Sequence, residues 1–186
     1  MSDSTAQKTI FDIFPEIRRI QDEDLKQVVV SAWNEYLEQY GYDAIMALPF
    51  SGFAADVTLV EHVGCVAEIA MSMADVFAAR MNSKVNKDLL LAAVLLHDLG
   101  KAYEYEFVDG AWRKTDIGKK FMHGFWGTYR SLNNGASVDL AHLISTHTPI
   151  SPVHAQLIEG VILHYADLAH ADMICMERGI ELYLSK

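Results

Sequence analysis

The sequence contains only two cysteines, Cys65 and Cys175, and they match none of the paired spacings of metal-binding or redox cysteines. We therefore expect a reduced, cytoplasmic setting. Long hydrophobic runs are also lacking. None reaches the roughly 18 residues of a membrane span, and the polar segment 1–10 is not followed by the apolar stretch of a signal peptide. We expect neither a signal peptide nor a membrane partner.

Basic residues are scarce as well. The chain has 15 Lys and Arg against 25 Asp and Glu, for a formal net charge of −10. Surfaces that bind long nucleic acids are normally basic, because affinity comes largely from neutralising phosphates, and no basic cluster of that size is present. The composition argues against long RNA or DNA as a partner. A small phosphorylated substrate fits better, since a bound metal can reverse the local charge inside a pocket.

What is present is typical of a globular protein: 186 residues, of which 51% are hydrophobic and 22% charged. Apolar residues at helical spacing, punctuated by cap residues, predict an all-α fold. Helices are expected over 22–39, from Asp56 or Thr58 to about Arg80, from Asn86 to near Gly100, from Thr115 or Asp116 to about Leu132, from Ser137 to about His147, and from the Ser151-Pro152 pair to about Gly179.

One segment departs from the helical period. Aromatic and acidic residues alternate over 103–108, and Asp109-Gly110 then supplies a two-residue turn, which predicts one small β-hairpin. The segment 44–53, with its proline and glycine, is expected to be a connection. We expect residues 1–52 to form an N-terminal helical extension packed on the core, and residues 53–186 to form one compact metal-binding domain.

The strongest local signal is the pair His97-Asp98, which follows the uniformly apolar stretch 89–96 and precedes Gly100 and Lys101. A buried carboxylate needs a partner or a cation, so this pair is typical of a metal site. Equally, the pair can lie exposed at a helix end, with Lys101 interacting with the helix dipole. These residues alone leave both interpretations open.

Four further polar residues shift the balance, because each falls on an apolar helix face or beside small residues: His62, His123, His147 and Asp167. Taken singly, each is more often a hydrogen-bonded core residue than a ligand. Together with His97-Asp98 they are spread over five predicted helices. So many buried polar groups need a shared partner, and a metal ion supplies one.

The order His62, His97-Asp98, His123, His147, Asp167 resembles the H…HD…H…H…D pattern of the HD superfamily of metal-dependent phosphohydrolases. The short sequence segments 59–62, 96–101 and 163–167 also look like that family, and the resemblance covers roughly residues 53–178. The hairpin after the HD pair is similar to the layout of certain bacterial 3′–5′ exoribonucleases. Those carry an OB-type domain that this sequence does not show.

The resemblance implies an HD-domain helical bundle and a metal-dependent phosphoric ester hydrolase, in which a metal-activated hydroxide cleaves a phosphoester of a nucleotide or other small phosphorylated molecule. It implies that His62, His97, Asp98 and Asp167 form the minimal metal site, that His123 and His147 complete a two-metal variant, and that Asp98 bridges. One or two divalent transition metal ions are expected, Mn, Fe, Co, Ni or Zn, because four histidines suit them better than Mg or Ca. Asp98 and Lys101 are the expected catalytic residues, with Lys101 also binding a phosphate oxygen of the substrate.

Two other functions remain open at this point. Inositol and phosphonate oxygenases share the fold and a di-iron version of the same ligand set. A regulatory HD module that binds a ligand without turnover is the second alternative. Residues around the motif are equally ambiguous: His164 and His170 can orient Asp167 but more often serve core or surface roles, and the aromatic residues of 103–112 can face the substrate or the N-terminal helices.

Overall fold

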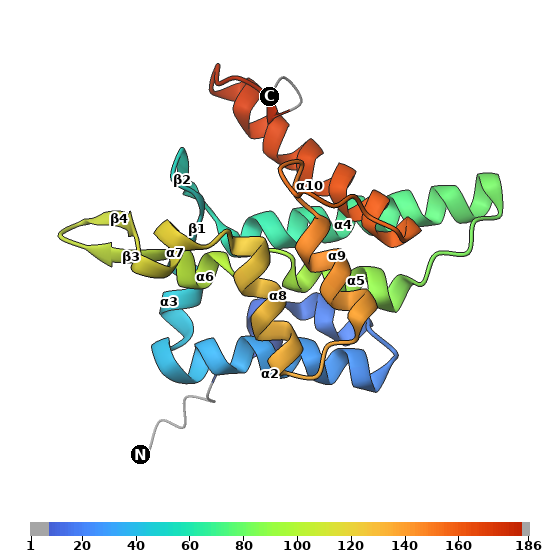
Figure 1. The fold of residues 1–186 in the computed structure, drawn as a ribbon, viewed down its shortest axis with the longest axis horizontal. Coiled ribbons are helices and arrows are strands. Elements are labelled where there is room, and N and C mark those ends of the chain that lie inside the picture. Colours follow the sequence, from blue (N-terminus) through green and yellow to red (C-terminus); the bar gives the residue numbers. More distant parts are fainter. Residues whose placement is uncertain (1–7, 184–186) are drawn as a thin grey trace, which may run out of the picture.

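The structure is a computed structural model, and it describes residues 8–183 of the chain. Helices surround one central helix, α5 (Lys87–Leu96), whose residues 90–96 are all buried (Figure 1). It contacts α2 (Glu23–Tyr40), α4 (Leu59–Met81), α9 (Val138–Thr146) and α10 (Ile158–Glu177). The remaining helical segments are α1 (Ile10–Ile13), a 3₁₀ turn (Pro15–Arg19), α3 (Tyr42–Ala47), α6 (Lys101–Glu104), α7 (Asp116–Lys120) and α8 (His123–Asn133). The predicted all-α fold is confirmed.

Cap residues begin the long helices where the sequence predicted them. The Asp22 side chain accepts hydrogen bonds from the backbone N–H groups of Asp24 and Leu25. Thr58 caps α4 and forms a capping box with Glu61, while Asn86 caps α5. The caps matter for function, because they fix the first turn of α4 and the register of α5, the two helices that carry His62 and His97.

Two helix predictions were wrong. The helix expected over 115–132 is broken at Phe121 and Met122, whose backbone is extended, so that α7 and α8 are separate. The last helix begins at Ile158 and not at the Ser151-Pro152 pair. The Ser151 hydroxyl is engaged in a local turn with the backbone of Val153 and caps no helix. The α5 helix also ends earlier than expected, at Leu96, and residues 97–100 form consecutive turns.

Two small hairpins lie on one side of the molecule (Figure 1). The predicted one pairs β3 (Tyr105–Val108) with β4 (Ala111–Lys114) in register from Tyr105–Lys114 to Val108–Ala111. Its turn residues Asp109 and Gly110 both have positive φ, as a type I′ turn requires. The second hairpin, β1 (Pro49–Ser51) and β2 (Ala54–Thr58), was not predicted. Its strands are too short to show an alternating pattern.

The N-terminal residues share the core of the rest of the molecule. Ile10, Phe14, Ile17 and Trp33 belong to the same buried cluster as α4 and α5. The Trp33 indole N–H donates to the carbonyl of Leu95 at 2.9 Å, directly behind the HD pair. The division of the chain at residue 53 stays a prediction.

Within residues 8–183, α4 is the one helix with the length and hydropathy of a membrane span. Core helices pass the same test, and α4 packs against α5 and α10.

Candidate metal centre

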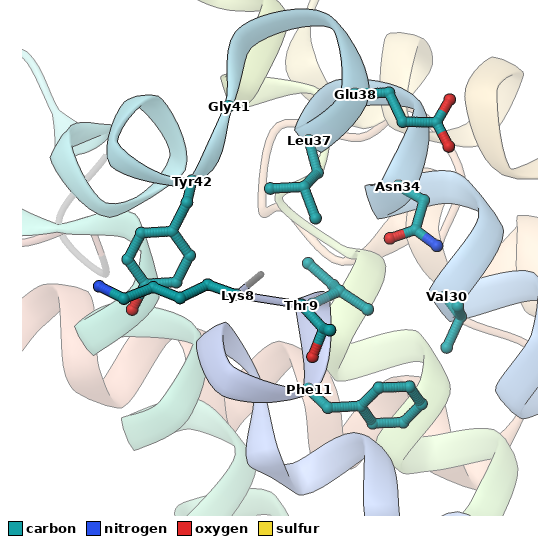
Figure 2. A pocket seen from close by; sticks show the side chains of 10 residues that line it. Lys8, Thr9, Phe11, Val30, Asn34, Leu37, Glu38, Gly41 and Tyr42 are labelled. Atoms are coloured by element: carbon teal, nitrogen blue, oxygen red, sulfur yellow. The ribbon is translucent and has the colours of Figure 1, made fainter. Parts of the chain in front are cut away.

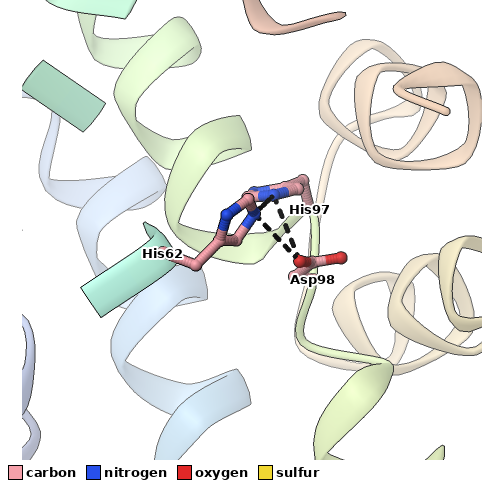
Figure 3. Close-up of side chains that lie close together, drawn as sticks. All are labelled: His62, His97 and Asp98. Atoms are coloured by element: carbon pink, nitrogen blue, oxygen red, sulfur yellow. Dashed lines mark hydrogen bonds and ion pairs between the residues drawn. The ribbon is translucent and has the colours of Figure 1, made fainter. Parts of the chain in front are cut away.

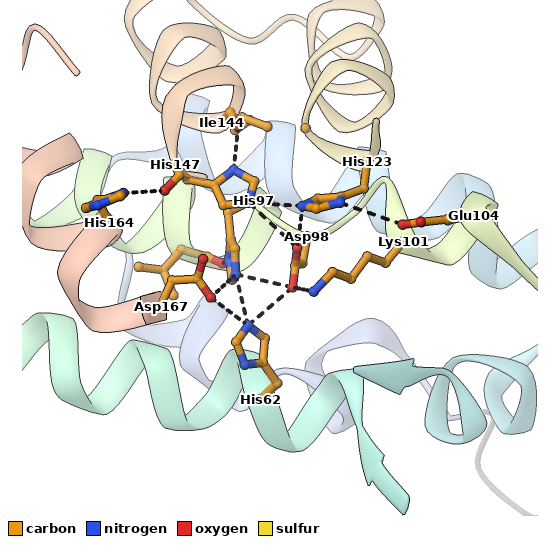
Figure 4. A network of polar contacts seen from close by, with 12 residues as sticks. His62, His97, Asp98, Lys101, Glu104, His123, Ile144, His147, His164 and Asp167 are labelled. Carbon is orange, nitrogen blue, oxygen red and sulfur yellow. Dashed lines mark hydrogen bonds and ion pairs between the residues drawn. The ribbon is translucent and has the colours of Figure 1, made fainter. Parts of the chain in front are cut away.

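The six residues predicted to bind metal come from different helices and meet at one point (Figure 4). His62 lies in the first turn of α4, and His123 is the first residue of α8; His97 and His147 follow the last residues of α5 and α9. Asp98 comes directly after His97, and Asp167 lies in the middle of α10. The sequence left open whether the HD pair is buried: His97 is 0% exposed and Asp98 1%.

One group of donor atoms gathers around His62 (Figure 3). Its Nε2 atom lies 3.2 Å from His97 Nε2, from Asp98 Oδ2 and from Asp167 Oδ1. His97 Nε2 lies 3.4 Å from the same Asp98 oxygen. These are the four residues that the family resemblance assigned to the minimal metal site.

A second group gathers on the other oxygen of Asp98. Asp98 Oδ1 lies 3.3 Å from His123 Nε2 and 3.7 Å from His147 Nε2, and these two ring nitrogens are 3.2 Å apart. Asp98 therefore turns one oxygen to each group, which is the geometry that a bridging carboxylate needs. The donor atoms of Asp98, His123 and His147 all lie within 4.8 Å of one another, as do those of His62, His97 and Asp98.

Backbone carbonyls decide which ring nitrogen faces the cluster. His97 Nδ1 lies 2.6 Å from the carbonyl of Val94, and His147 Nδ1 lies 2.7 Å from that of Ile144. A carbonyl only accepts, so Nδ1 of each ring carries the proton and Nε2 presents a lone pair. His123 Nδ1 lies 3.6 Å from the Glu104 carboxylate, longer than a hydrogen bond, and its Nε2 faces His147 Nε2 at 3.2 Å and Asp98 Oδ1 at 3.3 Å. The His123 tautomer with its proton on Nδ1 places two lone pairs 3.2 Å apart, and a cation between them removes their repulsion. The donors present therefore fit a metal ion.

Burial keeps the imidazoles of His97 and His123 neutral. It lowers the pKa of His97 to about 4 and that of His123 to about 3, although the charge of Asp98 acts in the opposite direction. Burial alone raises the pKa of the Asp98 carboxyl, but Lys101, His97, His62 and His123 together outweigh that effect and hold the pKa well below its usual range. Near neutral pH His97 and His123 are thus neutral while Asp98 is ionised, the protonation states that metal ligands require.

His62 behaves differently from the other histidines. Burial acts to lower its pKa, but hydrogen bonds with Asp167 and Asp98 outweigh that effect and the pKa is raised. In the metal-free protein the His62 proton and the Lys101 ammonium supply the positive charge that two buried carboxylates need. A metal ion that took His62 as ligand would displace that proton.

Lys101 and Glu104 extend the cluster toward the surface. Lys101 Nζ lies 2.7 Å from Asp98 Oδ2 and 4.2 Å from the ring centroid of Phe50. Glu104, only 7% exposed, contacts both His123 and Lys114, the latter at 2.6 Å. Lys101 is thus already directed at the buried carboxylate, as its place in the sequence motif suggested.

Sequence reasoning missed part of this environment. His170 Nδ1 lies 2.8 Å from His62 Nδ1, and the Phe50 ring packs 4.1 Å from that of His62, centroid to centroid. His164 donates through Nδ1 to the carbonyl of His147 at 2.7 Å. The sequence indicated at most that His164 and His170 flank Asp167 on α10. Nothing in it pointed to Phe50 or Glu104, whose contacts depend on where the hairpins return.

Some aromatic residues after Lys101 face the N-terminal helices, and another lines a cavity next to the metal-binding cluster. Tyr103 faces the N-terminal helices, with its ring 5.4 Å from that of Tyr36, and Trp112 packs against the core. Tyr105 lines two cavities, one shared with Tyr36 of α2 and one shared with Lys101 and His123.

A cavity of about 160 Å³ opens onto the cluster, and Asp98, Lys101, His123, Asp167 and Phe50 are among its lining residues. A larger cavity of about 500 Å³, between α1 and α2, holds none of the six predicted ligands (Figure 2). The smaller cavity is therefore the one lined by both Asp98 and Asp167.

Comparison with known proteins agrees with this geometry. The HD domain family matches residues 59–172, more than half of the chain and the stretch that contains all six clustered residues. The chain belongs to the HD domain family. The chain is 29% identical over 136 residues to the dihydroneopterin 2′,3′-cyclic phosphate phosphodiesterase of Methanocaldococcus jannaschii, an alignment covering 69% of this chain and 54% of that protein. The chain thus spans about half the length of this relative. Among solved structures there is no match.

Proposed function

We propose that this HD domain is a metal-dependent hydrolase that cleaves a phosphoester of a small phosphorylated molecule. The observation that carries the proposal is the gathering of four histidine ring nitrogens around the two carboxylate oxygens of Asp98. Asp167 lies beside His62, and the ammonium of Lys101 lies beside Asp98. The relative supports the substrate class, since its name describes the hydrolysis of a small cyclic phosphodiester. The net charge of −10 argues against long nucleic acids.

We assign the metal ligands as two overlapping sets. His62, His97, Asp98 and Asp167 would hold one ion, and His123, His147 and the second oxygen of Asp98 would hold another. The donor set of four histidines and two carboxylates suits Mn, Fe, Co, Ni or Zn. When bound, such ions lower the pKa of a coordinated water and neutralise charge on phosphoryl oxygens.

The side chains then divide the remaining work. Lys101 holds a phosphoryl oxygen and offsets the negative charge that develops on it, because its ammonium lies at the edge of the cavity beside Asp98. Apolar walls formed by Phe50 and Leu168 limit water in the cavity, which strengthens each of these charge interactions. In the reaction one water adds to phosphorus, the bond from phosphorus to the leaving oxygen breaks, and that oxygen gains a proton.

The test is metal content together with turnover. Protein purified without chelator is analysed for transition metals beside a His97→Ala, Asp98→Ala variant, and both are assayed on a panel of phosphomonoesters and 2′,3′-cyclic phosphates. The matched control is His142→Ala, a histidine on α9 that faces the backbone of Gln156 and not the cluster.

We expect bound metal and hydrolysis in the wild type and the control, and neither in the double variant. Bound metal without hydrolysis of any phosphoester would contradict the proposal. Iron together with oxygen consumption would replace it with an oxygenase function of the inositol oxygenase type.

A further inference from the structure

The cavity at the metal centre is too small for a whole nucleotide-sized substrate. Its volume is about 160 Å³, below the roughly 300 Å³ at which pockets for small organic ligands begin. The reacting phosphate fits inside, and the rest of the substrate must lie outside. The shape of the exits therefore determines what the remainder of the substrate can be.

One exit leads into a groove of about 420 Å³ between the two hairpins and α7. Four residues line both spaces and so connect them: Lys101, His123, Ile150 and Tyr183. In Figure 1 the elements of this groove, α6, α7 and the hairpins, lie together at one end of the molecule. The groove is thus a direct continuation of the reactive site.

The charge of this groove is opposite to that of the molecule. Four of the chain's nine lysines line it: Lys101, Lys114, Lys119 and Lys120. Glu104 is its one acidic lining residue among those that the structure describes, and Lys114 pairs with it at 2.6 Å. Lys101 precedes the hairpin, Lys114 ends it, and Lys119 and Lys120 follow it. The fold therefore brings these lysines together.

Two of the lysines remain available to a ligand. Lys119 has a long contact of 3.8 Å with Asp116, and both side chains are more than half exposed. Lys120 forms no ion pair with any residue in the range 8–183. Such exposed lysines on adjacent positions, in a chain of net charge −10, favour an anionic ligand.

The other exit lacks this charge. It passes Thr148 and Pro149 into a space of about 340 Å³ that no lysine or arginine lines within the described part of the chain. An anionic substrate is therefore directed toward the lysine groove, where Phe53, Tyr105 and Phe121 also offer aromatic surface.

We infer that the lysine groove binds a second phosphate group of the substrate, so that the substrate is a small molecule with two phosphate centres. This inference rests on the proposed hydrolase function. One phosphate reacts at the metal centre beside Lys101, and the other is held by Lys119 and Lys120, with Lys114 at the side. The molecule that joins them lies along the mouth of the cavity.

The test uses two chromogenic esters that differ by one phosphate: thymidine 5′-(4-nitrophenyl phosphate) and the same compound with a 3′-phosphate. Release of nitrophenolate reports only on the 5′ ester bond. In the metal-loaded wild type we expect kcat/KM about tenfold higher for the ester with two phosphates, the effect of a few exposed charge pairs. High salt should reduce this ratio, because it screens exposed charges.

Lys119→Gln, Lys120→Gln is the test variant, and its ratio should fall close to one. Lys114 is left unchanged because it pairs with Glu104 beside His123. The control, Lys84→Gln, Lys87→Gln, makes the same charge change in the loop before α5 and at the first residue of α5, and its ratio should stay near that of the wild type. A wild-type ratio near one, or a ratio unchanged in the test variant, would overturn the inference.

Binding separates this inference from the proposed function. If neither ester is hydrolysed, the hydrolase proposal fails for such esters. Calorimetric binding measurements then test whether the groove holds a second phosphate. Thymidine 3′,5′-bisphosphate should then bind at least about fivefold more tightly than thymidine 5′-monophosphate, and the test variant should abolish the difference. Equal affinity of the two nucleotides, or no binding, overturns the second phosphate site.

Discussion

At the scale of single residues, Asp98 is the side chain on which both halves of the cluster depend. Its Oδ2 atom faces His62 and His97, and its Oδ1 atom faces His123 and His147. A change at Asp98 therefore affects both groups of donors, whereas a change at His147 affects one. This difference allows the bridging role to be tested by counting ions.

We expect Asp98→Asn to lose most of the bound metal and His147→Ala to retain about one of two equivalents. Hydrolysis should fall more than about a hundredfold in Asp98→Asn, beyond the range typical of changes to outer partners of a metal site. Elemental analysis and steady-state kinetics measure both effects. Equal metal loss in the two variants would argue against a bridge.

His170 sets the orientation of His62. The two Nδ1 atoms are 2.8 Å apart, so one ring must donate to the other. If His62 is to present a lone pair at Nε2, its Nδ1–H has to donate and His170 has to accept. His170 fits this role, since burial lowers its pKa to about 4 and leaves the ring neutral near pH 7.

Removal of this acceptor should weaken metal binding. We expect His170→Ala to raise the metal Kd by about 10- to 100-fold, and His170→Gln to recover much of the loss because its amide oxygen also accepts. Competition with a chromogenic chelator measures the Kd directly. A purely structural role would lower thermal stability in both variants without separating Ala from Gln in metal affinity.

At the scale of elements, the turn after α5 lies almost in contact with the start of α8. A Cβ atom at Gly100 would stand 1.9 Å from the carbonyl oxygen of His123 and 2.8 Å from its Cα. Backbone atoms cannot move aside as a flexible side chain can. This glycine therefore sets the distance between the HD pair and His123.

Gly100→Ala should lower the free energy of unfolding by about 2–3 kcal/mol, since the start of α8 must shift to admit the methyl group. The control is Gly64→Ala in α4, where the nearest atom to the new Cβ is Glu16 Oε1 at 3.9 Å. That variant should gain about 0.5 kcal/mol, because alanine favours helix over glycine. Urea denaturation distinguishes the two. Similar stabilities would mean that α8 adjusts without cost.

The elements that the sequence predicted are those with local signals. Caps at Asp22, Thr58 and Asn86 are chemical features of a few neighbouring residues, and the helices begin there. The break at Phe121 and the late start of α10 at Ile158 depend on contacts with distant segments. At Gly118, for example, a Cβ would stand 2.4 Å from the carbonyl of Glu104, so α7 is held by the chain before the hairpin.

The same distinction holds for the site. His62, His147 and Asp167 interrupt apolar helix faces, so their inward orientation could be predicted from their own helices, whereas the burial of the HD pair was left open. The contacts of His170 with His62 and of Glu104 with His123 join elements that are distant in sequence. Periodicity carries no information about such pairs. The lysine groove was hidden for the same reason, since it forms only when the hairpin folds back.

At the scale of the whole molecule, the charged cluster lies at the centre of the shared core, so its protonation is linked to folding. His97 and His123 have pKa values of about 4 and 3 in the folded protein, while an unfolded chain has its histidines near 6.5. Between these values the unfolded chain binds protons that the folded protein does not. His62, whose pKa is raised, acts in the opposite direction near the upper end of that window and is protonated in both states at its lower end.

Stability of the metal-free protein should therefore fall as pH falls below about 6.5. Above that pH both states leave His97 and His123 neutral, so these residues contribute no slope. Between pH 7 and pH 5 we expect His97 and His123 to lower the free energy of unfolding by about 1–2 kcal/mol each, and His170, whose pKa is also about 4, adds to this drop. Urea denaturation of chelator-treated protein at a series of pH values measures the drop, and a His97→Gln variant should show a shallower slope by about one proton. A constant free energy from pH 7 to pH 5 would mean that these rings take up protons in the folded state, and that the core does not hold them as lone-pair donors for a metal.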